Sequence, residues 1–139
     1  FGDPEAEALL PRWEGDVAEV LGAAAEGRLD SVAPPTFTPD AAVCVMVAAD
    51  GYPDAPSIGD SISGLDTWRP DPSLHLYAAG VGPGLVTAGG RVLAVPGLGA
   101  SIAEARHKAY GGIERVSFSG MQYRSDIAAK AADRQEEEK

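Results

Sequence analysis

The sequence predicts an α+β protein, and three observations carry this prediction. Residues 1–30 contain helix-start signals and an apolar repeat with the period of a helix. Residues 41–49 form a Val-rich run typical of a buried strand, and two β-prone runs within residues 84–97 flank a Gly-Gly pair. A further helical repeat covers residues 101–116, so helices lie on both sides of a region of strands.

The first helix is predicted close to the beginning of the chain. Asp3 can cap it, Pro4 suits the first helical position, and Glu5 favours the positive end of the helix dipole. The helix would cover residues 4–13, with Pro11 breaking or kinking it because proline has no backbone N–H.

A second helix is predicted over residues 15–30, and Gly27 can end it. Its apolar stripe has the spacing i, i+3, i+4, i+7 and consists of Val17, Val20, Leu21 and Ala24. Residues 31–40 contain three prolines and no helical period, which predicts a linker.

Three further β segments are predicted after the strand at residues 41–49. Residues 61–65 form a possible short strand, and residues 73–80 alternate apolar with polar or aromatic side chains. Residues 84–97 are predicted to form a hairpin, since Gly89-Gly90 suits the positive φ angles of a tight two-residue turn.

The helix at residues 101–116 has local signals along its length. Ser101 and Glu104 have the spacing of a capping box, whereas Gly111-Gly112 weakens the last turns. Its predicted apolar stripe consists of Ile102, Ala105, Ala109, Ile113 and Val116. A last polar helix follows, and residues 135–139 are predicted to be a disordered tail.

Composition excludes several classes of function. The formal net charge of −10 over 139 residues argues against nucleic-acid binding, which needs a basic surface, and against an anionic membrane. A single cysteine excludes an internal disulfide and a cysteine-rich zinc site, and it suits a reducing, cytoplasmic compartment. No apolar run approaches the roughly 18–20 residues that span a bilayer.

Most motif searches fail. The glycines of residues 80–85 do not match the dinucleotide pattern, and residues 59–64 have one residue too many for a nucleophile elbow. His75 and His107 show no ligand spacing, so structural roles are favoured for both. Cys44 lies in an apolar strand, where a free cysteine usually packs as a small hydrophobic residue.

Three stretches remain as candidate sites. Gly2-Asp3-Pro4-Glu5 could hold a substrate carboxylate at a helix N-terminus, although ordinary capping also explains it. Residues 87–91 combine two glycines with an arginine, which suits phosphate, although a plain hairpin with a solvated arginine has the same sequence. Gly51-Tyr52-Pro53 with Gly59-Asp60 forms either a connector, favoured by local chemistry, or a substrate-facing loop.

Taken together, these motifs resemble one family. The order is FGDPE and a helix, then AAVCVMVAADGYP, LHLYAAG, LVTAGGRVLAVPGLG and finally F-G-YRSDI. This order is similar to the C-terminal third of glycinamide ribonucleotide synthetase, also called phosphoribosylamine–glycine ligase, over residues 1–132.

The resemblance implies an ATP-grasp ligase of purine biosynthesis that joins glycine to phosphoribosylamine. It implies that ATP and Mg²⁺ are bound upstream of Phe1, so no catalytic residue or metal ligand is expected in this chain. We therefore expect the chain to be the C-terminal fragment of a longer enzyme, inactive alone, with the upstream domains as its partners.

The resemblance also implies a division into domains. Residues 1–30 would be the last two helices of the ATP-grasp domain, and residues 31–40 the linker. Residues 41–134 would be the family's C-terminal domain, a small, mainly antiparallel β domain with packed helices, resembling the C-terminal domain of biotin carboxylase.

The family's site residues carry over only where the motifs match. Four of them, Gly2, Asp3, Pro4 and Glu5, would lie near the glycine and acyl-phosphate site. Gly89, Gly90 and Arg91 match a family hairpin, and Arg91 would face the phosphate of phosphoribosylamine.

Four positions depart from the family pattern: Ala78, Val81, Ala88 and Ala128. The first three replace polar residues near the expected ribose-phosphate site, which leaves an alternative of another class. The chain could be a non-catalytic, stand-alone binding or scaffolding module derived from this domain. A related carboxylase or carboxylate–amine ligase is a third reading, which the FGDPE and GYP motifs favour less.

Overall fold

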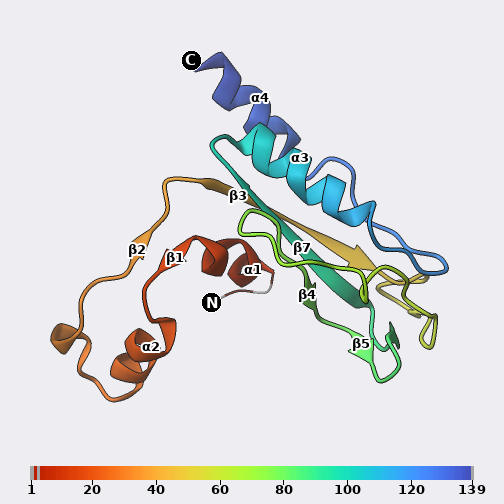
Figure 1. Cartoon of the computed structure of the whole chain (residues 1–139), viewed down its shortest axis with the longest axis horizontal. Coiled ribbons are helices and arrows are strands. Elements are labelled where there is room, and N and C mark those ends of the chain that lie inside the picture. Colours follow the sequence, from red (N-terminus) through yellow and green to blue (C-terminus); the bar gives the residue numbers. More distant parts are fainter. Residues whose placement is uncertain (1, 3, 139) are drawn as a thin grey trace.

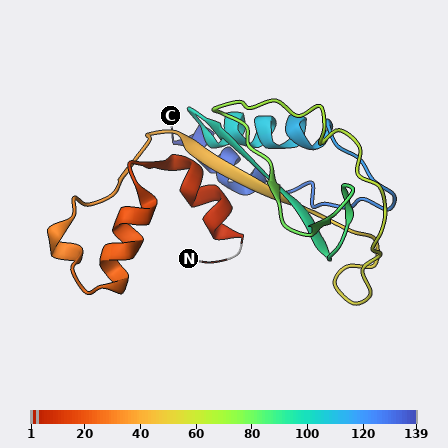
Figure 2. The ribbon, with the colours of Figure 1, turned by 60° about the horizontal axis from the view of Figure 1, so that its bottom comes forward.

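The computed structural model describes residue 2 and residues 4–138. An N-terminal helical segment lies beside an antiparallel sheet whose two long strands run diagonally across the molecule (Figure 1). Helix α3 (Ile102–Ile113) covers one face of this sheet, and α1 (Glu5–Leu9) lies on the other side (Figure 2). The predicted α+β class is confirmed.

The N-terminal segment follows its local signals. Helix α1 ends at Leu9, and Pro11 lies in the 3-10 turn η1 (Leu10–Arg12), as the break predicted there. Pro4 is the residue before α1 rather than its first residue. Helix α2 (Val17–Ala25) is capped by Asp16, whose side chain accepts a hydrogen bond of 3.1 Å from the backbone N–H of Glu19.

The predicted stripe of α2 is wrong in part. Ala23 is the buried residue of this helix, while Leu21 remains 45% exposed. Among the described residues, α2 packs mainly against the 3-10 turn η2 (Leu29–Ser31) that follows it.

Part of the predicted linker at residues 31–40 is a strand. Strand β2 (Thr36–Phe37) pairs with β1 (Trp13–Glu14). The rings of Trp13 and Phe37 meet edge to face with centroids 5.4 Å apart. Such cross-strand aromatic pairs stabilise short ladders, which explains a strand in a proline-rich stretch.

The main sheet has the order β3-β7-β4, and all its strands are antiparallel. Its strands are β3 (Ala41–Ala48), β7 (Arg91–Gly99) and β4 (Tyr77–Ala78). Val43, Val45 and Val47 of β3 point into the core beneath α3, whereas Cys44 and Met46 alternate onto the opposite, half-buried face. The predicted strand over residues 41–49 is therefore confirmed.

Helix α3 also agrees with its sequence signals. Ser101 caps it by accepting a 3.1 Å hydrogen bond from the N–H of Glu104, and Glu104 in turn accepts one from the N–H of Ala100. The predicted stripe faces the core, with Ala105, Ala109, Ile113 and Val116 buried and Ile102 packed against them. Gly97 of β7 lets the helix approach closely, because a Cβ there would lie 2.4 Å from the carbonyl oxygen of Ala105.

The predicted hairpin at residues 84–97 is wrong. Strand β6 (Val86–Thr87) pairs with β5 (Val81–Gly82) and not with β7. The turn between them is Pro83-Gly84, where Gly84 has φ 82° and the N–H of Leu85 donates to the carbonyl of Gly82. Proline followed by glycine at the centre of a turn is typical of type II, so this pair, not Gly89-Gly90, reverses the chain.

The other predicted β segments are shorter than expected. Residues 61 and 63 make only isolated bridges, to Val86 and Ser117. Residues 73–80 contain the short β4 and isolated bridges of Leu74, one of them to Gly97 of β7. Helix α4 (Ala129–Glu137) extends into the segment predicted to be a tail. Its Gln135 side chain accepts a 2.7 Å hydrogen bond from the N–H of Ile102, which ties α4 to the first turn of α3.

No helix among the described residues is long and apolar enough to cross a bilayer.

Candidate functional site

A groove of about 460 Å³ lies on the face of the sheet opposite α3. Alternate side chains of β3, namely Cys44, Met46 and Ala48, form its apolar floor. Its remaining walls are Pro4, Tyr52, Arg91, Gln122, Tyr123, Arg124 and Ile127. Apolar floors with a few polar groups on the walls are usual in small-molecule sites, so this groove is the candidate binding site.

The groove is lined by two of the predicted site residues, Pro4 and Arg91, which lie far apart in the sequence. Arg91 is the first residue of β7 and lies opposite Ala48 in the register of the sheet. Gly2 and Glu5 line a separate hollow of about 380 Å³ beside Arg12 and Ala42. Asp3 lies outside the described residues.

Gly89 and Gly90 do not line the groove, but they shape it. A Cβ on Gly90 would lie 2.4 Å from Cδ2 of Tyr52, so glycine here lets the Tyr52 ring lie against the backbone. Gly89 meets the backbone of Gly80, where a Cβ would lie 3.0 Å from the Gly89 Cα. The pair therefore permits close approach of backbone and ring beside Arg91.

The loop after β3 divides into two parts. Tyr52 is one wall of the groove, whereas Gly59 and Asp60 lie away from it. Asp60 is tied instead to the buried Thr87, whose hydroxyl accepts a 3.0 Å hydrogen bond from the Asp60 N–H. Of the two alternatives for this loop, a connector fits Asp60, which makes a structural contact. A substrate-facing position stays a prediction for Tyr52, which lies beside the groove.

Sequence reasoning missed the wall formed by residues 122–127. Gln122 pairs with Ala48 by two backbone hydrogen bonds of 2.8 and 3.0 Å, which extends the sheet at the free edge of β3. Its side-chain amide donates a 2.7 Å hydrogen bond to the carbonyl of Ala49. The YRSDI motif covers residues 123–127, but its local sequence does not indicate that it lies beside β3.

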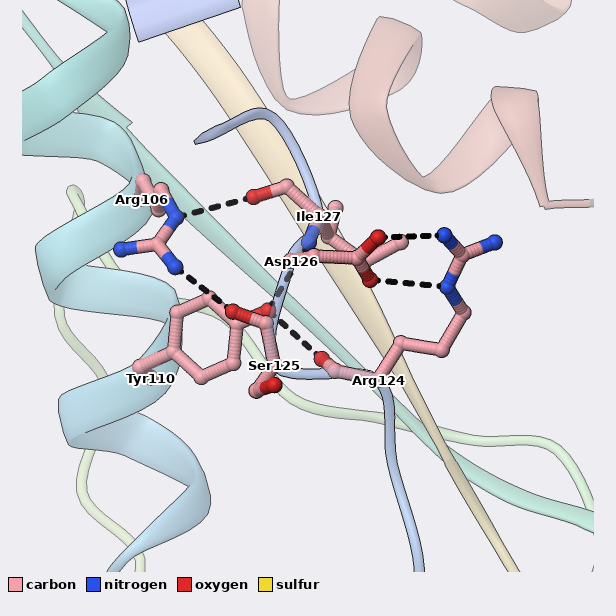
Figure 3. Close-up of polar contacts among 6 residues, drawn as sticks. All are labelled: Arg106, Tyr110, Arg124, Ser125, Asp126 and Ile127. Carbon is pink, nitrogen blue, oxygen red and sulfur yellow. Dashed lines mark hydrogen bonds and ion pairs between the residues drawn. The ribbon is translucent and has the colours of Figure 1, made fainter. Parts of the chain in front are cut away.

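Side chains of α3 hold this wall by its backbone (Figure 3). Tyr110 donates a hydrogen bond of 2.6 Å to the carbonyl of Arg124, and its oxygen accepts one of 3.2 Å from the N–H of Ile127. Arg106 donates to the carbonyls of Ile127 at 2.9 Å and Ser125 at 2.6 Å. The segment that carries Arg124 is therefore fixed to the helix on the other side of the sheet.

Cys44 is chemically quiet, although it lies on the groove floor. Burial and, secondarily, the negative charge of Glu7 raise the pKa of the Cys44 thiol to about 12. The thiol therefore stays protonated near neutral pH, which agrees with packing rather than nucleophilic chemistry.

Among residues 2 and 4–138, no group of three His, Cys, Asp or Glu side chains is placed to hold a metal ion. These residues thus do not provide a site that fits a resident Mg²⁺ by themselves.

Comparison with known proteins identifies the family. The model of the family "Phosphoribosylglycinamide synthetase, C domain" matches residues 42–130. The chain belongs to this family. Its resemblance to the synthetase, inferred from the sequence motifs, is confirmed.

Individual relatives agree with this family. A phosphoribosylamine–glycine ligase of Neisseria meningitidis serogroup A is 46% identical, with 96% of this chain and 32% of that protein covered. The ligase of Caulobacter vibrioides is 44% identical, over 94% of this chain and 31% of that protein. The crystal structure of the Thermotoga maritima ligase superposes with a TM-score of 0.71 at 38% identity, covering 92% of this chain and 31% of that chain.

The chain therefore spans about a third of the length of the synthetase-family ligases that it matches.

Proposed function

We infer that this chain is the C-terminal part of an ATP-dependent ligase that joins glycine to 5-phosphoribosylamine and yields glycinamide ribonucleotide in purine biosynthesis. The observation that carries the proposal is the groove in which Pro4 and Arg91, both assigned by the resemblance, meet. The match with named ligases over nearly the whole chain supports the same reaction.

The proposal gives the groove walls distinct roles. Arg91 would bind the phosphate of phosphoribosylamine, because its guanidinium can donate two parallel hydrogen bonds to phosphate oxygens. Residues 2–5 would lie near the glycine carboxylate. ATP, bound upstream together with Mg²⁺, would supply the phosphoryl group that activates this carboxylate as an acyl phosphate. The amine of phosphoribosylamine would then attack the carboxyl carbon, forming the amide bond as the C–O bond to phosphate breaks, with release of inorganic phosphate and a proton.

The proposal retains the domain division made from the sequence. Residues 1–30 would close the ATP-grasp domain, and residues 41–134 would form the C-terminal domain, similar to that of biotin carboxylase. The protein would work in the cytoplasm, with its upstream domains as the partners that complete the site.

The test of the reaction is an Arg91→Ala variant of the full-length ligase. We expect KM for phosphoribosylamine to rise by the equivalent of about 1.5–3 kcal/mol, the range for a hydrogen bond to a charged group, with KM for glycine unchanged. Steady-state assay of glycinamide ribonucleotide formation measures both constants.

Arg69→Ala is the matched control, because Arg69 is exposed and donates only to nearby backbone carbonyls of Asp66 and Trp68. An unchanged KM in Arg91→Ala would refute the role of Arg91. Failure of the full-length protein to form the product would instead favour the alternative, a non-catalytic binding or scaffolding module.

A further inference from the structure

Arg124 brings a guanidinium to the groove that the sequence prediction did not include. It lines the same groove as Arg91 but comes from the other side of β3, since Arg91 lies on the central strand β7 and Gln122 pairs with the outer edge of β3. Two guanidinium groups at one groove contrast with the formal net charge of −10 of the whole chain. Such a local pair of planar donors suits the oxygens of an anion such as phosphate or carboxylate, and the proposed function favours a phosphate monoester.

The side chain of Arg124 is oriented and still has donors to offer. Its Nε and Nη2 atoms donate to the two carboxylate oxygens of Asp126 at 2.9 and 2.6 Å (Figure 3). A guanidinium has five N–H groups, so three remain beyond this pair. The side chain is 73% exposed, so these donors can reach a ligand.

The backbone of this segment is fixed by α3 independently of Asp126. The hydroxyl of Tyr110 and the guanidinium of Arg106 bind the segment at Arg124, Ser125 and Ile127, and the Arg106 guanidinium lies over the Tyr110 ring at 4.7 Å. The Tyr123 ring, also on the groove, lies 6.1 Å from the Tyr110 ring. Arg106 and Tyr110 thus position Tyr123 and Arg124. Arg106 and Tyr110 themselves do not line the groove.

We propose that Arg124 is a second phosphate ligand of the groove and that Arg106 and Tyr110 are its positioning residues. This inference rests on the proposed function, since it extends the phosphate site assigned to Arg91. The ligand class is a sugar phosphate monoester, gripped between guanidinium groups on the two sides of the apolar floor.

The experiment measures binding of ribose 5-phosphate to the full-length ligase by titration calorimetry, for the wild type, Arg124→Ala, Arg91→Ala and the Arg69→Ala control. We expect Arg124→Ala to raise Kd about tenfold to a hundredfold, as for other charge-assisted hydrogen bonds, and Arg69→Ala to leave it unchanged. Kinetic assay should show a higher KM for phosphoribosylamine in Arg124→Ala, with KM for glycine unchanged.

Tyr110→Phe tests positioning with little change in shape. We expect a several-fold rise in Kd in the wild-type background and no further rise in the Arg124→Ala background, because both changes would remove the same interaction. A purely structural role of Tyr110 would instead give the same effect in both backgrounds, and that result would overturn its assignment. Arg106→Lys, which keeps the charge but not the planar fork, provides a second variant.

The outcomes separate this inference from the proposed function. Unchanged binding in Arg124→Ala together with weakened binding in Arg91→Ala overturns the role of Arg124 and leaves the proposed reaction standing. Weakened binding in Arg124→Ala, in a full-length protein that forms no product from glycine, supports the phosphate site and overturns the reaction. Absence of ribose 5-phosphate binding by the wild type overturns the phosphate site itself.

Discussion

Cys44 lies on the floor of a proposed ligand groove and yet has a thiol that resists ionisation. Burial is the main cause of its raised pKa, and the charge of Glu7 adds to it. In the unfolded chain the Cys44 thiol ionises near pH 9, whereas in the folded state it stays protonated. Rising pH therefore favours the unfolded state. The free energy of unfolding should therefore be unaffected by Cys44 below about pH 8 and decline between about pH 9 and pH 12.

The same pKa predicts slow thiol chemistry. At pH 8, we expect native Cys44 to react with an aromatic disulfide reagent roughly a hundredfold to a thousandfold more slowly than in urea-unfolded protein, because thiolate is the reactive form. Absorbance of the released thiol measures both rates. Glu7→Gln should speed the native reaction modestly, since it removes only the secondary cause. Equal native and unfolded rates would contradict the raised pKa.

Single residues of the groove differ in how far the sequence could predict them. Pro4 and Arg91, which line the groove, could be predicted, because each belongs to a motif with its own local chemistry. Gln122 and Arg124 were not, since their place depends on an edge pairing with Ala48 that brings distant segments together. Tyr52 could be predicted in part. Its loop is a candidate in the sequence, but the packing of its ring on Gly90 depends on the tertiary structure.

Among the elements, those with several agreeing local signals were predicted best. Helix α3 has a cap, an apolar stripe and a length that agree, and strand β3 has an uninterrupted apolar run. The hairpin failed because a Gly-Gly pair serves both tight turns and close backbone contacts, and only tertiary structure distinguishes them. The segment at residues 88–90 instead continues toward β3, where the Gly90 carbonyl accepts a 2.9 Å hydrogen bond from Ala49.

The contact between α3 and β7 makes opposite predictions for two glycines. Gly97→Ala should lower the free energy of unfolding by about 1–3 kcal/mol, because its Cβ would press on the helix backbone at Ala105 and Ala109. Gly111→Ala should raise it by about 0.5–1 kcal/mol, because Gly111 lies within α3 with open space around it, and alanine is the better helix former.

Equilibrium urea unfolding of the two variants measures these changes, and the helix variant is the matched control for the strand variant. A neutral Gly97→Ala would show that α3 can move away from the sheet without cost, contrary to the close packing described here.

Across the whole molecule, the sheet separates a packed side from a side open to ligands. Helix α3 and the valines of β3 form the core on one side, while the groove and α1 lie on the other. The hydrogen bonds from Arg106 and Tyr110 to residues 124–127 are the described polar link between them (Figure 3). Stability and the proposed ligand binding would thus depend on largely different residues.

The chain on its own is expected to form no glycinamide ribonucleotide from glycine, phosphoribosylamine and ATP. The described residues provide no group of metal-ligating side chains, and the relatives are about three times as long. Product assay of the chain alone, and of the chain mixed with the separately made upstream part, tests this. Product from the chain alone would contradict the prediction, whereas product only from the mixture would support it.

Because the side chains of β3 alternate between two faces, neighbouring positions of this strand should differ in the substitutions that evolution tolerates. At positions 43, 45 and 47, a new side chain meets the packed core, so selection should reject nearly every substitution. At positions 44 and 46, a new side chain meets the half-buried face that forms the groove floor, so we expect more substitutions to be tolerated there than at the core positions. Within one strand, the core-facing positions should therefore vary little among descendants, whereas the groove-facing positions next to them should vary more.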